Sequence, residues 1–324
     1  MLRKKPPVLL ILVGLLAVVL LVSGCTREKE KPLRLGMLPI TDNLPFWVAE
    51  AKGYFGDAGV EVELVHFPSA LERDTAIQAG QIDGALGDII AVAQLNAGGS
   101  PVKIVSIGQG VTAEEGRFAI LASPKSDITE PSQLKGVPVA CSLKTIMEYV
   151  VDELLVSAGL GPEEIKKVQI AKIPQRLDAL LNGTVQAAVL PDPIAALAEV
   201  KGARVIVEDT AGANITQTVI YFRQETLDHD HNGRAVKKLM QAYARAVEDI
   251  QASPRAYDTL LAEKARVPAP VLENSNHGMK VLFSPPQVPT EEQISRVVEW
   301  MTAHGILAKP MRYDDLVDKR VLAE

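Results

Sequence analysis

Apolar and polar positions follow a regular order through residues 33–69. The apolar run Leu33–Met37 predicts a strand that Pro39 ends, and Pro45 suits the first turn of a helix over residues 46–54. After a glycine-rich turn, residues 60–65 alternate between apolar and polar side chains, which is typical of a strand. A strand, a helix and a second strand form a right-handed parallel unit, and ligands bind at the carboxyl ends of such strands. The loops expected at those ends are residues 41–43 and 68–70.

The same order continues to about residue 122 and restarts at residue 137. In the first block, Ser69 with Glu72 predicts a capped helix to residue 79. The block also holds predicted strands over residues 81–86, 102–107 and 118–122, and a helix over 89–96. The second block holds predicted strands over 137–141, 168–170, 185–190 and 205–207, and helices from residue 142 to about 158, over 176–181 and over 194–199. A strand over 216–222 then returns toward the first block, and helices over 234–251, 254–263 and 291–304 follow.

This order predicts an α/β protein with two lobes and a helical C-terminal tail. We expect the first lobe to comprise residues 33–120 and 218–324, and the second lobe residues 121–217. The apolar stretches 118–122 and 216–222 are then the two hinge strands that join the lobes. The cleft between the lobes would collect loop ends from both.

The N-terminus is typical of an export signal. Arg3, Lys4 and Lys5 precede an apolar run of 15 residues, Val8–Val22, which is shorter than the roughly 20 residues that a membrane-spanning helix needs. The run ends in Val22-Ser23-Gly24-Cys25, which resembles the lipobox of bacterial lipoproteins. We expect residues 1–24 to be a signal peptide, Cys25 to be lipidated and residues 25–32 to be a tether. The alternatives are an ordinary signal peptide with a chance cysteine and an uncleaved membrane anchor.

Charge and composition exclude some partners. The formal net charge of −6 and the low aromatic content of 4% argue against a nucleic-acid partner, because such proteins need basic patches and stacking side chains. Only Cys25 and Cys141 are present, so a lipidated Cys25 leaves Cys141 without a disulfide partner. We expect Cys141 to be a small buried residue at a strand end.

Several phrases of the sequence resemble the solute-binding proteins of bacterial ABC transporters, in the group for nitrate, taurine, aliphatic sulfonates and thiamine pyrimidines. These phrases are LPFWVAEAKGYF at 44–55, VEVELVHF at 60–67, AGQIDGALGD at 79–88, PSQLKGVPVA at 131–140 and NGTVQAAVLPDP at 182–193. The resemblance implies a type II periplasmic-binding-protein fold, in which two α/β lobes close on a ligand. It also implies a monomer that is extracytoplasmic, anchored to the membrane by its lipid, and partnered by the subunits of an ABC permease.

Candidate ligand contacts are the side chains of the predicted strand-end loops and of the helix turn that follows the first loop. They are Thr41, Asp42, Asn43, Phe46, Trp47, Ser69 and Asp88 from the first lobe, and Ser142, Thr145 and Asp192 from the second. Phe46 or Trp47 could form the floor of the pocket. Ser69 and Ser142 lie at helix starts, where free N–H groups favour an anionic ligand, although each serine could be a purely structural cap.

The three aspartates point to another ligand chemistry. Several buried carboxylates need partners, so Asp42, Asp88 and Asp192 either pair with Lys144 or Arg117 or meet a ligand that carries an amine. Asp88 could instead be only a helix cap, and Asp192 could be held only by the prolines on either side of it. If two of the three face the ligand, a taurine-like or aminopyrimidine-like solute is favoured over nitrate.

Enzyme signatures are missing from the sequence. It contains no Gly-x-Ser-x-Gly, His-Glu-x-x-His, phosphate-loop or dinucleotide-binding motif, and its five histidines are scattered. We therefore expect a non-catalytic importer component without a cofactor or a bound metal, which captures a small sulfur- or nitrogen-containing organic solute. The alternatives are a pyrimidine synthase of thiamine-precursor synthesis on the same fold, disfavoured by the single remaining cysteine, and a metal-ion-binding lipoprotein.

Overall fold

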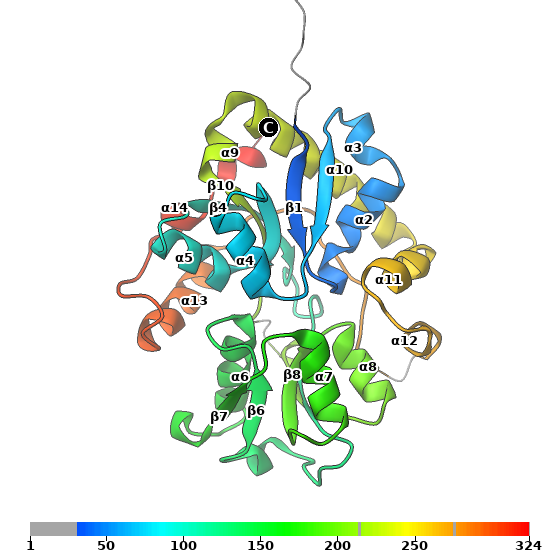
Figure 1. Ribbon diagram of the computed structural model, residues 1–324, viewed down its shortest axis with the longest axis vertical. Helices are drawn as coiled ribbons and strands as arrows, with labels where there is room; N and C mark the ends of the chain where they lie inside the picture. Colours follow the sequence, from blue (N-terminus) through cyan, green and yellow to red (C-terminus); the bar gives the residue numbers. More distant parts are fainter. Residues whose placement is uncertain (1–30, 213–214, 275–276, 324) are drawn as a thin grey trace, which may run out of the picture. The chain divides into compact units, whose positions relative to one another are not determined.

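The computed structural model describes residues 31–212, 215–274 and 277–323. The predicted signal peptide, Cys25 and all but the last two residues of the tether lie outside these ranges. Residues 33–324 form one unit, which is organised around two five-stranded sheets (Figure 1). The predicted α/β class with two sheet-based lobes is confirmed.

The first sheet has the strand order β2-β1-β3-β10-β4. Its members are β1 (Leu33–Met37), β2 (Val62–His66), β3 (Gly84–Asp88), β4 (Val102–Gln109) and β10 (Thr218–Arg223). β1 pairs in parallel with both β2 and β3, whereas β10 runs antiparallel to β3 and β4. β1 and β3 are almost fully buried, which is why they appear in the sequence as short continuous apolar or small-residue runs.

The second sheet repeats this arrangement. Its order is β7-β6-β8-β5-β9, with β5 (Phe118–Ala122), β6 (Pro138–Cys141), β7 (Lys166–Gln169), β8 (Ala187–Pro191) and β9 (Arg204–Glu208). β6 is parallel to β7 and β8, and β5 is antiparallel to β8 and β9. Each position of the first sheet therefore has an equivalent in the second, and β2, β1 and β3 correspond to β7, β6 and β8.

Each sheet receives its antiparallel strand from the other half of the chain. β5 follows β4 of the first sheet but pairs in the second, and β10 follows β9 of the second sheet but pairs in the first. Residues 118–120, expected at the end of the first lobe, belong instead to β5 of the second sheet. A fully buried strand is an apolar run whichever sheet it joins, so the pattern could not assign β5 to its sheet. The chain crosses between the sheets through residues 110–117 and 209–217.

Helices cover the sheets on both faces (Figure 1). They are α2 (Leu44–Ala51), α3 (Tyr54–Asp57), α4 (Ala70–Gln78) and α5 (Ile89–Ala97), then α6 (Ile146–Ser157), α7 (Ile173–Leu181) and α8 (Ile194–Val200), and finally α9 (Gln224–Asp228), α10 (Asp230–Ala252), α11 (Asp258–Lys264), α12 (Ala269–Glu273), α13 (Glu291–Ala303) and α14 (Tyr313–Leu316). Short 3₁₀ turns lie at Thr41–Asn43, Pro131–Leu134, Pro162–Glu164, Asp209–Ala211, Pro254–Tyr257 and Lys319–Val321. We call the first sheet with α2–α5, α10 and α13 the first lobe, and the second sheet with α6–α8 the second lobe.

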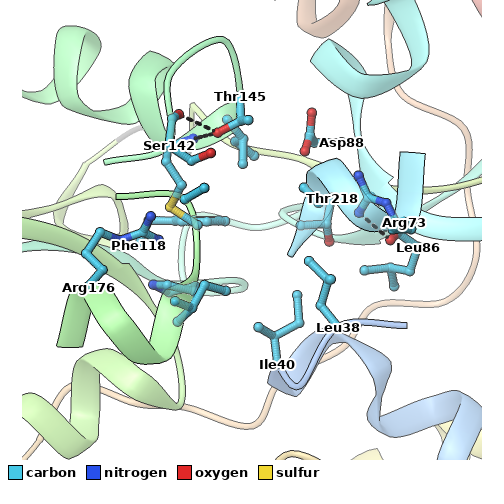
Figure 2. A pocket seen from close by; sticks show the side chains of 17 residues that line it. Leu38, Ile40, Arg73, Leu86, Asp88, Phe118, Ser142, Thr145, Arg176 and Thr218 are labelled. Carbon is cyan, nitrogen blue, oxygen red and sulfur yellow. Dashed lines mark hydrogen bonds between the residues drawn. The ribbon is translucent and has the colours of Figure 1, made fainter. Parts of the chain in front are cut away.

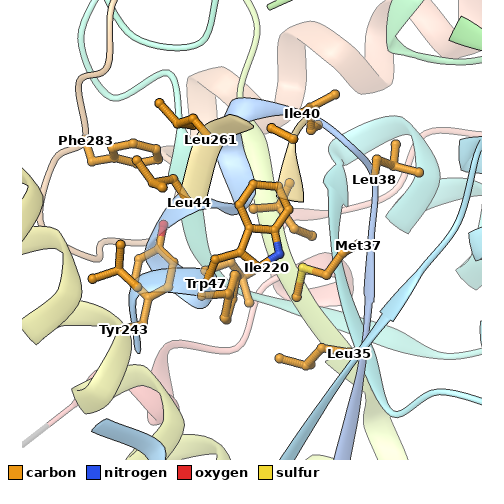
Figure 3. Close-up of a cluster of buried hydrophobic side chains, with 14 of the residues drawn as sticks. Leu35, Met37, Leu38, Ile40, Leu44, Trp47, Ile220, Tyr243, Leu261 and Phe283 are labelled. Atoms are coloured by element: carbon orange, nitrogen blue, oxygen red, sulfur yellow. The ribbon is translucent and has the colours of Figure 1, made fainter. Parts of the chain in front are cut away.

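The core of the first lobe lies between its sheet and the helices α2 and α10. Trp47 of α2 is completely buried there among Met37, Leu44 and Ile220 (Figure 3). The rings of Phe46 and Tyr243 lie 4.8 Å apart, which joins α2 to α10. Burial of one such side chain contributes about 1.5–3 kcal/mol. Both aromatic residues of the Phe46-Trp47 pair are thus core residues of the first lobe.

In the part of the chain that the structure describes, no helix combines the length and the apolar character that a membrane span requires.

Candidate functional site

A cavity lies between the two lobes and is lined by residues of both (Figure 2). The first lobe contributes Leu38, Ile40, Ala70, Arg73, Leu86, Gly87, Asp88 and Thr218, and the second contributes Phe118, Ser142, Thr145, Ile146, Met147, Ala171, Ile173, Arg176 and Pro191. Its volume is about 50 Å³, several times the roughly 10–15 Å³ that one water molecule needs. It therefore has room for a small group of atoms.

The cavity lies at the carboxyl ends of parallel strands in both sheets. Leu38 follows β1, Asp88 ends β3, Ser142 follows β6 and Pro191 ends β8. This is where ligands bind in open α/β sheets, because the loops and helix starts that follow the strands meet there. The parallel strands of each sheet thus direct their loops toward the same space.

Arg73 of α4 is the first of two buried arginines in the lining, and its side chain is 1% exposed. Its Nε donates to Asp74 at 2.8 Å, and its Nη1 donates to the carbonyl oxygen of Leu86 at 2.8 Å. Its Nη2 is buried without a hydrogen-bond partner among the described residues. Burial alone would lower the pKa of Arg73, but the carboxylate of Asp74 and further neighbours raise the pKa overall, so the guanidinium stays charged.

Gly87 makes room for this guanidinium. A Cβ at residue 87 would lie 2.8 Å from Nη1 of Arg73 and 2.8 Å from the ring of Tyr221, closer than side-chain atoms approach one another. The glycine at the end of β3 therefore allows Arg73 to lie beside the sheet and reach the cavity.

Arg176 of α7 is the second buried arginine, and it is completely inaccessible to solvent. Its Nη1 donates to the carbonyl oxygen of Ile170 at 2.9 Å, while its Nε and Nη2 have no hydrogen-bond partner among the described residues. Burial lowers the pKa of Arg176 to about 10, so the side chain still carries its charge at neutral pH. An unpaired buried charge is costly, and these N–H groups lack an acceptor.

The two arginines hold equivalent positions in the two lobes. α4 connects β2 to β3 and α7 connects β7 to β8, and each arginine is the fourth residue of a nine-residue helix. The sequence analysis did not select either of them. A signal was present, because each arginine lies at helical spacing among buried apolar positions: Ala76 and Ile77 in α4, and Ile173, Leu177 and Leu180 in α7.

Of the predicted ligand residues, Asp88, Ser142 and Thr145 line the cavity. Asp88 also caps α5, since its Oδ1 accepts from the backbone N–H of Ala91 at 2.8 Å, and burial raises its pKa. Thr145 caps α6 by accepting from the N–H of Met147 at 3.2 Å, and its hydroxyl donates to the carbonyl oxygen of Ser142 at 2.7 Å. Ser142 lies in the loop between β6 and α6, so the predicted helix start at this residue is wrong, since α6 begins at Ile146. Two hydroxyl side chains and one carboxylate thus reach the cavity.

The other predicted residues of the first lobe do not line this cavity. Thr41, Asp42 and Asn43 form a buried 3₁₀ turn, in which burial raises the pKa of Asp42 to about 6. Phe46 and Trp47 belong to the core described above. Ser69 caps α4 by accepting from the N–H of Glu72 at 3.3 Å. These six residues were expected at the site because the sequence pattern locates the strand-end loops. It does not indicate the direction in which their side chains point.

Asp192 is also held elsewhere. Its Oδ1 lies 3.4 Å from Nη1 of Arg117 and accepts from the N–H of Ala196 at 3.2 Å, and burial raises its pKa to about 6. Arg117 contacts Glu199 and Glu208 as well, at 2.8 and 2.5 Å. Pairing with Arg117 is one of the two alternatives that the sequence left open for the buried carboxylates. Asp88 is the only one of the three aspartates in the described lining, while Oδ2 of Asp42 and Oδ2 of Asp192 are buried without a hydrogen-bond partner among the described residues.

The chemistry of the lining favours an anionic group joined to a small apolar body. The lining contains two guanidinium groups and one carboxylate, and most of the remaining wall is apolar, including Leu38, Ile40 and Phe118. Buried N–H groups of arginine bind carboxylate, sulfonate or similar oxyanions through charge-assisted hydrogen bonds. Within the described residues, no group of three or more His, Cys, Asp or Glu side chains is placed to hold a metal ion.

Cys141 ends β6 and is fully buried, and burial raises the pKa of its thiol to about 12.

Comparison with known proteins gives a family and several neighbours of the same fold. A family model described as "NMT1/THI5 like" matches residues 40–257. The alkanesulfonate-binding protein SsuA of Xanthomonas axonopodis pv. citri, bound to MOPS, is 19% identical, with 89% of this chain and 99% of that chain covered and a TM-score of 0.73. The nitrate-binding protein NrtA of Synechocystis PCC 6803 is 14% identical, with 91% and 88% covered and a TM-score of 0.72. At these identities the likeness shows the fold, which is that of periplasmic binding proteins.

Two further matches are less direct. The nitrate import ATP-binding protein NrtC of Synechococcus elongatus is 39% identical over 59 residues, which are 18% of this chain and 9% of that relative. The chain thus spans less than a tenth of the curated relative it matches. The desulfurization enzyme DSZB is 16% identical, with 90% of this chain and 98% of that chain covered and a TM-score of 0.64. The fold is therefore shared by binding proteins and by an enzyme.

Proposed function

The chain belongs to the NMT1/THI5-like family, and on that premise we propose that it is the solute-binding component of an ABC importer that captures a small organic anion between its lobes. The observation that carries the ligand class is the pair of buried arginines, Arg73 and Arg176, in one cavity. Unpartnered N–H groups on both guanidinium groups provide binding sites for the oxygens of an anion. The apolar wall provides a place for its carbon skeleton.

The anion and the two lobes together give a mechanism. A ligand whose oxygens contact Arg73 in one lobe and Arg176 in the other favours the arrangement in which the lobes meet around it. It also removes the cost of leaving N–H groups of two buried guanidinium groups without acceptors. The sulfonate and nitrate ligands in the printed names of the structural neighbours are anions, which supports this class. Of the two solute types weighed from the sequence, a sulfonate fits this lining better than an aminopyrimidine.

The role that we propose is binding without catalysis. The described lining contains no cysteine or histidine to act as a nucleophile or base, and Cys141 is buried with a thiol pKa of about 12. Because an enzyme has the same fold, the absence of catalysis is tested by experiment. Conversion of a bound sulfonate to a product by the purified chain would contradict a purely binding role.

Anchoring at the outer face of the membrane through a lipid on Cys25 is the second part of the proposal. It rests on the residue pattern 3–25 alone, since these residues lie outside the described part of the chain. Mass spectrometry of the N-terminal peptide from the native host tests it. A diacylglyceryl group on Cys25, lost in Cys25→Ala, is the expected result, and an unmodified Met1 at the N-terminus contradicts it.

The test of the ligand class is a thermal-shift screen followed by calorimetry. The screen contains alkanesulfonates, taurine, small carboxylates, nitrate and aminopyrimidines. A ligand at 100 times its Kd stabilises the folded chain by about 2.7 kcal/mol, which gives a clear rise in Tm. We expect compounds with a sulfonate or carboxylate group on a short carbon skeleton, taurine included, to raise the Tm, and compounds without an anionic group to have no effect. A rise confined to aminopyrimidines would overturn the anion assignment.

A further inference from the structure

A second and larger cavity between the lobes adjoins the cavity that holds Arg73 and Arg176. Its volume is about 240 Å³, compared with about 50 Å³ for the arginine cavity. The residues that line both cavities are Ala70, Asp88, Ser142, Thr145 and Ala171. Asp88, Ser142 and Thr145 lie along one side of the arginine cavity, so the two spaces meet there (Figure 2). We call the arginine cavity the inner cavity and the larger one the outer cavity.

The inner cavity is too small for a complete organic solute. Small-molecule sites have volumes of roughly 300–1,000 Å³, which the outer cavity approaches and the inner cavity does not. Under the proposed function, on which this inference rests, an anionic group binds between Arg73 and Arg176. The remainder of the solute then extends past the shared residues into the outer cavity.

Two helices of the first lobe line the outer cavity with polar side chains. Ala70, Asp74 and Gln78 recur at four-residue spacing on α4, so they share one face of that helix. On α5, Gln94 follows Ala91 by three residues and extends the same wall. The outer cavity thus runs along both helices from their first turns, where it meets the inner cavity, toward their C-terminal ends.

The second lobe forms the other wall with residues 142–145, between β6 and α6, and with Gln169 at the end of β7. Hydrogen bonds hold this wall in place. Oε1 of Gln169 accepts from the N–H of Leu143 at 2.6 Å. The carbonyl oxygen of Lys144 accepts from the side-chain amide of Gln94 on the first lobe. Each lobe therefore contributes amide side chains to one space.

The charged side chains of the outer lining balance one another. They are Asp74, Asp88 and Lys144. Oδ1 of Asp74 accepts from Nε of Arg73 at 2.8 Å and from the hydroxyl of Tyr221 at 3.1 Å, so this carboxylate already has a cationic partner. Asp88 and Lys144 remain, with one charge of each sign. The outer cavity therefore has no surplus charge that would select a charged group, in contrast to the inner cavity with its two guanidinium groups.

Three side-chain amides in the outer lining keep free hydrogen-bonding capacity. Gln78 makes no side-chain hydrogen bond to another described residue, and Gln94 and Gln169 each use only one end of the amide. An amide donates through its N–H groups and accepts through its oxygen, so it can bind a hydroxyl, an ether or another amide. These groups are uncharged, in agreement with the balanced charges of the lining.

We propose that the outer cavity binds the tail of the solute and selects tails that carry an uncharged hydrogen-bonding group, namely a hydroxyl, an ether or an amide. The substrate class is then an organic anion with a polar, uncharged tail. An apolar tail would displace water from the amides without replacing its hydrogen bonds, and a charged tail would lose water without meeting a surplus of the opposite charge. Leu71, Leu95 and Leu143 of the same lining contact the carbon atoms of the tail.

Calorimetry with solutes that differ only at the end of the tail tests this selection. The sulfonate series is butane-1-sulfonate, 4-hydroxybutane-1-sulfonate and 4-aminobutane-1-sulfonate, and the carboxylate series is pentanoate, 5-hydroxypentanoate and 5-aminopentanoate. In the series whose head group the chain prefers, we expect the hydroxyl compound to bind about 3- to 10-fold more tightly than the other two, which is the effect of one neutral hydrogen bond.

The double variant Gln78→Leu/Gln94→Leu locates the selection. It keeps the side chains at similar size and removes both amides of the first lobe, so the hydroxyl and apolar compounds should bind it with equal affinity. Gln175→Leu is the matched control, because Gln175 is an exposed residue of α7 that lines neither cavity, and it should retain the preference. Circular dichroism of the ligand-free variants checks that the fold is intact.

The outcomes separate this inference from the proposed function. Equal affinity for the hydroxyl and apolar compounds in the wild type, tighter binding of the amino compound, or a preference that persists in the double variant would overturn the tail selection and leave the anion class in place. No binding of either series would overturn the proposed function, and the tail selection with it.

Discussion

Arg73 and Arg176 occupy the same position in two equivalent helices, one in each lobe, and both line one cavity. Each donates one hydrogen bond to a backbone carbonyl, and each keeps N–H groups that have no acceptor among the described residues. Because the two lobes repeat the same arrangement of strands and helices, each lobe provides one guanidinium group to the cavity. Under the proposed function, a ligand that contacts both guanidinium groups favours the arrangement in which the lobes meet around it.

Replacing Arg176 by Met should have opposite effects on stability and on binding. Met removes an unpaired buried charge at similar volume, so we expect the ligand-free chain to become more stable by about 1–4 kcal/mol. Anion affinity should fall by about 10- to 100-fold, since a charge-assisted hydrogen bond contributes about 1.5–3 kcal/mol. Denaturant unfolding and calorimetry with the anion that raised the Tm measure the two effects. A variant that is less stable and binds normally would show that Arg176 is only structural.

Gly87→Ala should weaken binding although it removes no charge. The added methyl group would lie 2.8 Å from Nη1 of Arg73, so the guanidinium must move away from the end of β3. We expect about a tenfold loss of anion affinity, equivalent to 1.4 kcal/mol, with a smaller loss of stability. Gly56→Ala is the control, because a Cβ there meets no atom within 4 Å. Equal affinity in both variants would argue against a direct role for Arg73.

Substitution of Trp47 should change the stability of the fold and leave the affinity for the ligand unchanged. Its side chain is completely buried in the core and absent from the cavity lining. Trp47→Ala should lower the free energy of unfolding by about 3–5 kcal/mol, and Trp47→Phe should lower it less. Calorimetry with Trp47→Phe should give the wild-type Kd. A large change in Kd would restore the earlier expectation that this tryptophan forms the floor of the pocket.

Asp209 should make stability fall as the pH rises. It joins the two segments that cross between the lobes, since it accepts from the N–H of Phe118 at 2.8 Å and from the hydroxyl of Thr216. Burial raises the pKa of Asp209 from 3.8 to about 7. Between these values the folded chain binds more protons than the unfolded chain, so the free energy of unfolding decreases with rising pH, by an amount on the order of 4 kcal/mol at most.

Asp209→Asn isolates this effect. The amide keeps an acceptor for Phe118 and a donor for Thr216 but cannot ionise. Urea unfolding at about pH 5 and pH 8 should show a flatter pH dependence and greater stability at the higher pH. Asp127→Asn changes an exposed carboxylate and serves as the control. The same pH slope in Asp209→Asn as in the wild type would contradict the prediction.

The sequence by itself determined the α/β class, the repeated strand–helix order and the family. These follow from local properties such as the apolar run Leu33–Met37 and the helix cap Ser69. It also located the loops that reach the cavity, because the carboxyl ends of parallel strands share one edge of a sheet.

Only the tertiary structure decided which side chains enter the cavity and which sheet each crossing strand joins. Trp47 and Asp192 follow the predicted strands, but Trp47 lies in the core and Asp192 pairs with Arg117, and their neighbours come from distant segments. Arg73 and Arg176 lie 103 positions apart, and each looks like an ordinary charged helix residue in its own segment. Their buried, unpartnered N–H groups exist only where two lobes meet, since desolvation depends on the packing of the whole chain and not on local sequence.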